Sequence, residues 1–161
     1  MEIYFDQLAL IKTEQPDKVR EYSLQLKSAN LKQIGFPKRS DNDQRVPNYD
    51  FNTIEPFWDT RYMEGAYSQL GVVTELIEKQ DNALAIIGAG EGIEIEFVDD
   101  LPLLEEGFNR YYIMKFKGWA KDMDILTKDG ERLEPMPFNG IVDAKAHRLN
   151  QKYNTRFKAG K

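Results

Sequence analysis

Two carboxylates two residues apart, Asp122 and Asp124, are the side chains of this sequence best suited to acid–base chemistry. In an extended backbone both would point to one side of the chain, about 7 Å apart. That separation falls within the range of the acid and base of an inverting glycoside hydrolase. The same oxygens could also start a calcium site, which needs six or more oxygen ligands. Because two carboxylates specify neither site, we favour a solvated loop or an ion pair with Lys121.

The segment that holds these carboxylates is also the strongest candidate for a binding site. Trp119 follows Gly118, whose backbone freedom permits a sharp turn out of a sheet. An outward Trp119 beside mixed charges has the composition of an interaction hot spot. The alternative is that Trp119 covers the core while the two carboxylates accept backbone hydrogen bonds in a turn. The candidate binding residues are Trp119, Lys121, Asp122, Asp124 and, from a second segment, Trp58.

That second segment is rich in aromatic residues. If exposed, they would suit the binding of sugars or peptides. If buried, they would fix a long loop to the rest of the domain, and we favour burial because aromatic side chains bury large areas. The cluster comprises Tyr49, Phe51, Phe57, Trp58, Tyr62 and Tyr67.

Three other motifs predict no chemistry. The sequence GAGEG at 88–92 lacks the spacing of a dinucleotide fingerprint and precedes a strand, so it predicts a β-turn. The sequence SDND at 40–43 lacks the glycine and glutamate of an EF-hand and predicts a polar surface loop. His147 is the only histidine, which excludes a multi-histidine metal site, and nothing supports its use in a Ser-His-Asp triad.

Length and charge bound the class of protein. The chain has 161 residues, which fits one domain over 1–161, and a net charge of −5. Lysines and arginines are scattered, with no basic block except a short C-terminal tail, so we expect no nucleic-acid partner. No apolar run has transmembrane length, so we expect a soluble protein without membrane insertion. The absence of cysteine excludes thiolate, iron–sulfur and Cys-zinc chemistry, and no cofactor is predicted.

Hydrophobic periodicity predicts mainly β structure. Strands are expected at 2–12, 20–27, 31–36, 83–87, 93–97 and 110–119, the clearest being 93–97 with Ile93, Ile95 and Phe97 inward. Residues 72–80 favour a helical turn, 37–67 a long irregular stretch, and Asp129-Gly130 a turn. The predicted fold is an antiparallel β-sandwich, of which a jelly roll is one form, with a C-terminal helix.

The C-terminal helix has its own pattern. Asp143 is placed to cap it, and Ala146, Leu149, Tyr153 and Phe157 then share one face at helical spacing. At the other end, the strand-like sequence EIYFDQLALI follows Met1 directly, so we expect no signal peptide. The compartment stays undetermined.

Several stretches together resemble a known family. They include IYFDQLAL (3–10), EGAYSQLGVVTELIEKQDNALAIIGAGEGIEIEF (64–97), LPLLEEGFNRYYIMKFKGWAKDMD (101–124) and LEPMPF (133–138). In this order they are similar to the C-terminal module of bacterial FG-GAP and ASPIC/UnbV repeat proteins, over most of the chain. The sharpest part is Gly118-Trp119, Lys121-Asp122 and Asp124, followed by Glu134-Pro135 and Pro137-Phe138. The propeller repeats of those large, often secreted proteins are absent here.

The resemblance implies a non-catalytic accessory or interaction module with no established ligand. We therefore expect a small subunit that binds a protein partner. The alternatives are a carbohydrate-binding module and a hydrolase that uses Asp122 and Asp124. A flat apolar patch would favour protein binding, parallel exposed aromatics would favour a sugar, and a deep cleft holding both carboxylates would favour hydrolysis.

Overall fold

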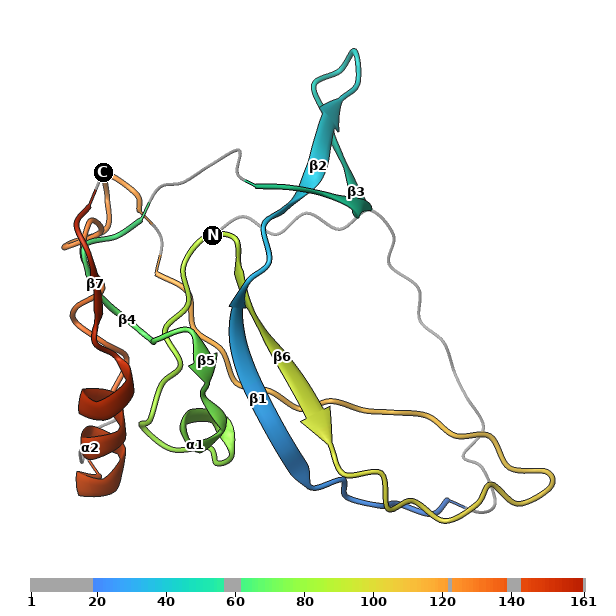
Figure 1. Ribbon diagram of the computed structural model, residues 1–161. Helices are drawn as coiled ribbons and strands as arrows, with labels where there is room; N and C mark the ends of the chain where they lie inside the picture. Colours follow the sequence, from blue (N-terminus) through green and yellow to red (C-terminus); the bar gives the residue numbers. More distant parts are fainter. Residues whose placement is uncertain (1–18, 57–61, 122, 139–142, 161) are drawn as a thin grey trace.

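The computed structural model describes residues 19–56, 62–121, 123–138 and 143–160. About 30% of these residues lie in strands and 11% in helices, so the protein is mainly β. The strands form small sheets that do not make a clear sandwich (Figure 1). In chain order the elements are β1 (Leu26–Gln33), β2 (Phe36–Asp41), β3 (Pro47–Glu55), β4 (Gly65–Tyr67), β5 (Gly71–Val72), α1 (Thr74–Ile77), β6 (Glu91–Phe97), α2 (Ala144–Tyr153) and β7 (Arg156–Lys158).

The central sheet has the order β5-β1-β6 and is antiparallel throughout. Its register pairs Ala29 with Ile95 and Leu31 with Ile93, so the apolar residues of both strands face the core. Glu94 points to solvent, as the alternation of β6 predicts. Phe97 was predicted to point inward, but it is exposed because the sheet ends there.

The core lies between this sheet, α1 and α2. Its buried side chains are small or aliphatic, and Ile93, Ile95 and Tyr153 pack against them while partly exposed. The helical turn predicted in 72–80 is confirmed as α1. The buried set is Ala29, Leu31, Val73, Leu76, Ala83, Ala146 and Leu149.

The C-terminal helix is confirmed, including its cap. The Asp143 side chain accepts a hydrogen bond from the Lys145 amide at 2.9 Å. Ala146 and Leu149 are buried, but Phe157 does not continue their face. The helix ends at Tyr153, and Phe157 lies exposed in β7.

Residues 83–87 were predicted to be a buried strand, and this is wrong. The segment forms no strand among the described residues, and its backbone is bound mainly by side chains, together with the Ser68 amide, which donates to the Ile86 carbonyl at 3.0 Å. The Leu84 amide donates to Asn150 Oδ1 at 2.9 Å, and the Ile86 amide donates to Ser68 Oγ at 2.8 Å. The turn predicted at 88–92 is present, with Gly90 at a φ of 70°.

The long irregular stretch predicted for 37–67 is also wrong in large part. Its first half forms the β2–β3 hairpin, and its end forms β4. Asn42 holds the hairpin loop, since its side chain accepts from the amides of Gln44 and Val46. Figure 1 shows the hairpin projecting from the remaining elements. Among the named elements, β2 and β3 contact only each other.

The strand predicted at 110–119 is absent, and of the strand predicted at 20–27 only Leu26 and Lys27 lie in a strand, at the start of β1. The predicted strand at 2–12 lies outside the described residues. Within the described ranges, no helix is long and apolar enough to cross a membrane.

Candidate functional site

The long connection between β6 and Lys121 is the most unusual surface of the described chain. Residues 98–121, which we call the arm, run outward from β6, turn near Gly107 and return (Figure 1). The turn is closed by the Phe108 amide, which donates to the Glu105 carbonyl at 3.2 Å, and Gly107 supplies the required positive φ of 83°. The outward half, residues 99–106, is the acidic limb, and the returning half, residues 108–121, is the basic limb.

The arm exposes large apolar side chains on both limbs. Leu103 is 95% exposed on the acidic limb, and Ile113 and Phe116 are 84% and 82% exposed on the basic limb. Tyr111, Tyr112 and Met114 are exposed as well. Large apolar side chains gathered in one exposed segment are typical of an interaction site in a folded protein.

Beyond Phe108, the backbone of the basic limb makes no hydrogen bond to the backbone of the described residues. No backbone–backbone hydrogen bond joins residues 109–120 to any other described residue. The sequence has the apolar, β-favouring composition of a strand, yet the polar groups of the main chain have no protein partner in this part of the structure. A bare extended segment of this kind is a template for pairing with another strand.

The arm is held to the domain at few points. Its start is fixed by the Val98 amide, which donates to the Gln25 carbonyl at 2.9 Å. Near its tip, Arg20 pairs with Glu105 and lies 4.9 Å from the centre of the Phe108 ring. Between the limbs, Arg110 Nη2 donates to the Pro102 carbonyl at 2.6 Å.

Of the predicted site residues, Trp119 and Lys121 lie at the end of this arm, and Asp124 follows just beyond it. Trp119 is 51% exposed, so its side chain is neither buried over the core nor fully exposed to solvent. Lys121 Nζ donates to the Glu134 carbonyl at 2.7 Å. Asp122 and Trp58 lie outside the described residues.

Asp124 holds a turn. Its carboxylate accepts from the Leu126 amide at 2.8 Å, and its carbonyl accepts from the Thr127 amide at 3.0 Å. This is the structural alternative that the sequence analysis left open for Asp124. The turn lines an open cleft of about 480 Å³, whose other lining residues include Asp129, Glu131 and Arg132.

The aromatic cluster predicted around Trp58 is divided. Tyr67 is buried, as we favoured, whereas Tyr49 and Phe51 are exposed on β3. The rings of Tyr49 and Phe51 are 6.4 Å apart and inclined by 40°. Their inclination does not provide a flat stacking platform. The remaining ring on a described residue, Tyr62, packs edge-on against Tyr67.

Sequence analysis missed one buried ionic cluster. The side chain of Glu91 is 0% exposed, and its two oxygens accept from Arg156 at 2.6 and 2.7 Å. Lys158 Nζ donates to the same carboxylate at 2.8 Å, and the Gly88 amide donates at 2.8 Å. Lys158 also lies 3.6 Å from the centre of the Tyr62 ring. Only the two-residue spacing of Arg156 and Lys158, on one face of a strand, signalled this cluster.

The cluster is electrostatically satisfied. Burial by itself raises the pKa of Glu91, but hydrogen bonds from Arg156 and Lys158 outweigh burial and lower the pKa from 4.5 to about 2. The carboxylate is therefore ionised and fully bonded. It joins β7 to the turn before β6 and has no free oxygen for a substrate.

Neither metal binding nor serine catalysis has a framework among the described residues. No group of three or more His, Asp or Glu side chains is placed there to hold a metal ion. Ser68 is buried, and its hydroxyl donates to Asn154 Oδ1 at 2.5 Å while accepting from the Ile86 amide. His147 is exposed on α2.

No family model, curated protein or solved structure matches this chain.

Proposed function

We propose that this protein is a non-catalytic interaction module that binds another protein chain through its arm. The observation that carries the proposal is the basic limb, where exposed apolar side chains coincide with an unbound backbone. Water is a poor environment for the apolar side chains, and a partner strand would satisfy both the side chains and the main chain. The proposal agrees with the module implied by the resemblance to FG-GAP and ASPIC/UnbV proteins, which we also retain as a proposal.

The two alternatives have weaker support. A hydrolase would need two carboxylates facing one substrate, whereas the described member of the predicted pair, Asp124, holds a turn by accepting from the Leu126 amide. A sugar platform would need coplanar exposed rings, whereas Tyr49 and Phe51 are inclined to each other. Binding of a protein partner requires only exposed apolar side chains and an unpaired backbone, and the arm has both.

Strand pairing along the arm would also affect the architecture. All pairs of named strands are antiparallel. A strand added along the basic limb would extend this antiparallel pattern. We therefore keep the antiparallel sandwich with its C-terminal helix as a proposal for the fully assembled protein.

Site-specific photo-crosslinking in the native host tests the function. A photoreactive phenylalanine analogue at Ile113 is expected to give discrete cross-linked protein species, because this side chain would lie in the interface. The same analogue at Gln151, an exposed position on α2, is the control and is expected to give none. Identical products at both positions, or no product at Ile113, would contradict the proposal.

A further inference from the structure

We infer that the partner of the arm is the arm of a second copy of this chain, paired antiparallel so that each acidic limb faces the other copy's basic limb. The inference rests on the proposed function, namely that the arm binds protein. It adds the identity of the partner and the symmetry of the interface.

The distribution of charge carries the inference. The acidic limb contains Asp99, Asp100, Glu105 and Glu106 and no cation. The basic limb contains Arg110, Lys115, Lys117 and Lys121 and no carboxylate. The arm is therefore sharply divided by charge, although the whole chain is only mildly acidic at −5.

Most of these charges have no partner in the described part of one chain. Glu105 pairs with Arg20, and the other two engaged groups, Arg110 and Lys121, donate to carbonyls. The remaining five have no ion pair or hydrogen bond with a described residue: Asp99, Asp100, Glu106, Lys115 and Lys117. Unmatched charges of both signs on one arm are what a self-complementary surface requires.

A two-fold symmetric interface would bring the acidic limb of each copy against the basic limb of the other. When the same segment meets itself under two-fold symmetry, residue i contacts residue j and residue j contacts residue i. Centring the antiparallel register on Phe108 places Asp99 opposite Lys117 and Glu106 opposite Arg110. Both charge contacts then occur twice in the dimer.

The same register also pairs the apolar residues. Leu103 comes opposite Ile113, and Leu104 comes opposite Tyr112. All four side chains are more than half exposed in the single chain. Directly opposed apolar pairs are the unit of stabilisation between antiparallel strands. One register therefore pairs both the apolar residues and two of the charge pairs, Asp99 with Lys117 and Glu106 with Arg110. Asp100 and Lys115 come opposite Phe116 and Leu101 instead.

A partner that carries charges of only one sign would fit the arm less well. A nucleic acid or another polyanion would match the basic limb, but the four carboxylates of the acidic limb would repel it. A purely acidic protein surface would meet the same repulsion. A second copy matches both limbs at once.

Charge reversal tests the inference. One variant carries Asp99→Lys and Asp100→Lys, and the other carries Lys115→Glu and Lys117→Glu. None of these four side chains has a described partner, so both variants are expected to fold as the unaltered chain does. Molar mass is measured by sedimentation equilibrium over a range of concentrations, with 18.7 kDa as the mass of one chain.

The unaltered protein is expected to approach twice that mass as its concentration rises. Each variant alone places like charges opposite each other, and its dimer dissociation constant is expected to rise at least about 100-fold. An equal mixture of the two variants restores opposite charges in both limbs and is expected to form a heterodimer. Reversing two exposed lysines outside the arm, with Lys79→Glu and Lys128→Glu, is the control and should leave the dimer intact.

Two results would overturn the inference. The first is an unaltered protein that stays monomeric at every concentration, as it would if the two limbs closed on each other within one chain. The second is a mixture of variants that stays monomeric although the unaltered protein dimerises. Photo-crosslinking at Ile113 to a different protein, with no product of doubled mass, would refute the self-pairing and leave the proposed function standing.

Discussion

Glu91 shows how a single side chain can join distant parts of this chain. It stands at the start of β6, and its partners Arg156 and Lys158 lie in β7, close to the C-terminus. Arg156 also donates through Nε to the Ser68 carbonyl at 2.9 Å. A buried ion pair gains stability only when its remaining hydrogen-bonding positions are satisfied, and here they are.

Removing the charge of Glu91 should therefore be costly. Glu91→Gln leaves two partly buried cations without their anion, and we expect a loss of about 3–5 kcal/mol in the free energy of unfolding at neutral pH. The loss should shrink as the pH falls. The pKa of Glu91 is about 2 in the folded protein and near 4.5 in the unfolded chain, so its contribution is complete above pH 4.5 and disappears as the pH falls towards 2.

Glu94→Gln is the matched control, because Glu94 lies in the same strand and pairs with Lys32 on the surface. Exposed ion pairs contribute about 0–1 kcal/mol, so this variant should unfold almost as the unaltered protein does. Urea unfolding followed by fluorescence at several pH values measures both variants. Equal losses for the two variants would show that burial of Glu91 does not matter.

For single residues, the sequence predicted some of the roles that the structure shows and missed others. The alternative role of Asp124 as a turn residue was correct, because a short carboxylate followed by amides two residues on is a local pattern. The Glu91 cluster could not be predicted, since Glu91 is far in sequence from Arg156 and Lys158, and the two-residue spacing of these cations does not identify their anion.

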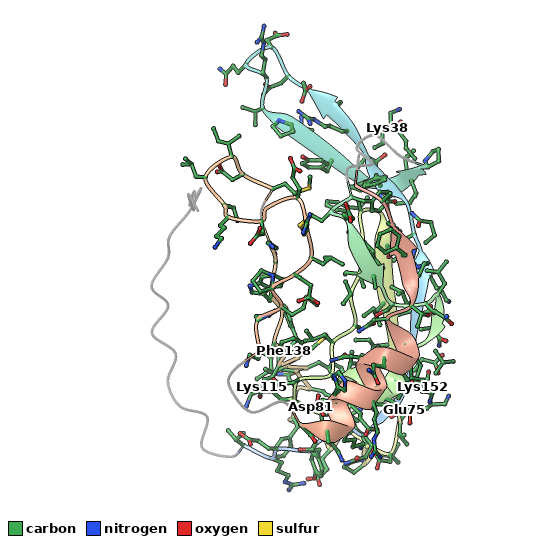
Figure 2. The ribbon with its side chains drawn as sticks, turned by 90° about the vertical axis from the view of Figure 1, so that its left-hand side faces the viewer. Lys38, Glu75, Asp81, Lys115, Phe138 and Lys152 are labelled. Atoms are coloured by element: carbon green, nitrogen blue, oxygen red, sulfur yellow. The ribbon has the colours of Figure 1, made fainter. Side chains whose placement is uncertain are left out.

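Among the elements, α2 could be predicted because its N-cap and its buried face are both encoded in neighbouring residues. The sequence predicts its N-terminus from Asp143 and its buried face from the spacing of Ala146 and Leu149, and the structure confirms both. An ion pair of 2.6 Å from Lys152 to Glu75 joins it to α1, and Figure 2 shows these two side chains close together. The helix thus combines a strong start signal with a buried face.

Loss of the cap should weaken α2 in a measurable way. Asp143→Ala removes the acceptor of the Lys145 amide and should lower the free energy of unfolding by about 1 kcal/mol. Asp143→Asn retains an acceptor oxygen and should cost much less. Urea unfolding monitored by circular dichroism distinguishes the two. If Asp143→Asn proved as damaging as Asp143→Ala, the charge of the residue rather than its hydrogen bond would be responsible.

Elements that depend on distant contacts were predicted less well. The alternation of β6 is visible in sequence because only one of its faces is buried. The β2–β3 hairpin was missed because its loop uses Arg45 at a φ of 59°, where a glycine would have signalled the turn. Residues 83–87 look like a strand, but Ser68 and Asn150 take the hydrogen bonds that a neighbouring strand would have made.

The whole molecule divides into a packed part and exposed extensions. Most core residues lie on the central sheet and the two helices, whereas the β2–β3 hairpin and the arm extend beyond them (Figure 1). Figure 2 shows Lys38 of the hairpin and Lys115 of the arm far apart. An isolated two-stranded hairpin is at best marginally stable in water, so exposed extensions of this kind are the regions that open most readily.

Limited proteolysis of the dilute protein should therefore begin in the arm. Trypsin is expected to cut after Lys115 and Lys117 at least about tenfold faster than after Arg156. Residues 109–120 make no backbone–backbone hydrogen bond with a described residue, whereas Arg156 lies in the buried ionic cluster. Mass spectrometry of short digests identifies the bonds cut first. A variant with Lys115→Gln and Lys117→Gln should lose these early products and keep the later ones. If Arg156 were cut as fast as the arm in the unaltered protein, the C-terminal strand would be opening as readily as the arm. The ionic cluster around Glu91 would then not be what holds β7 in place.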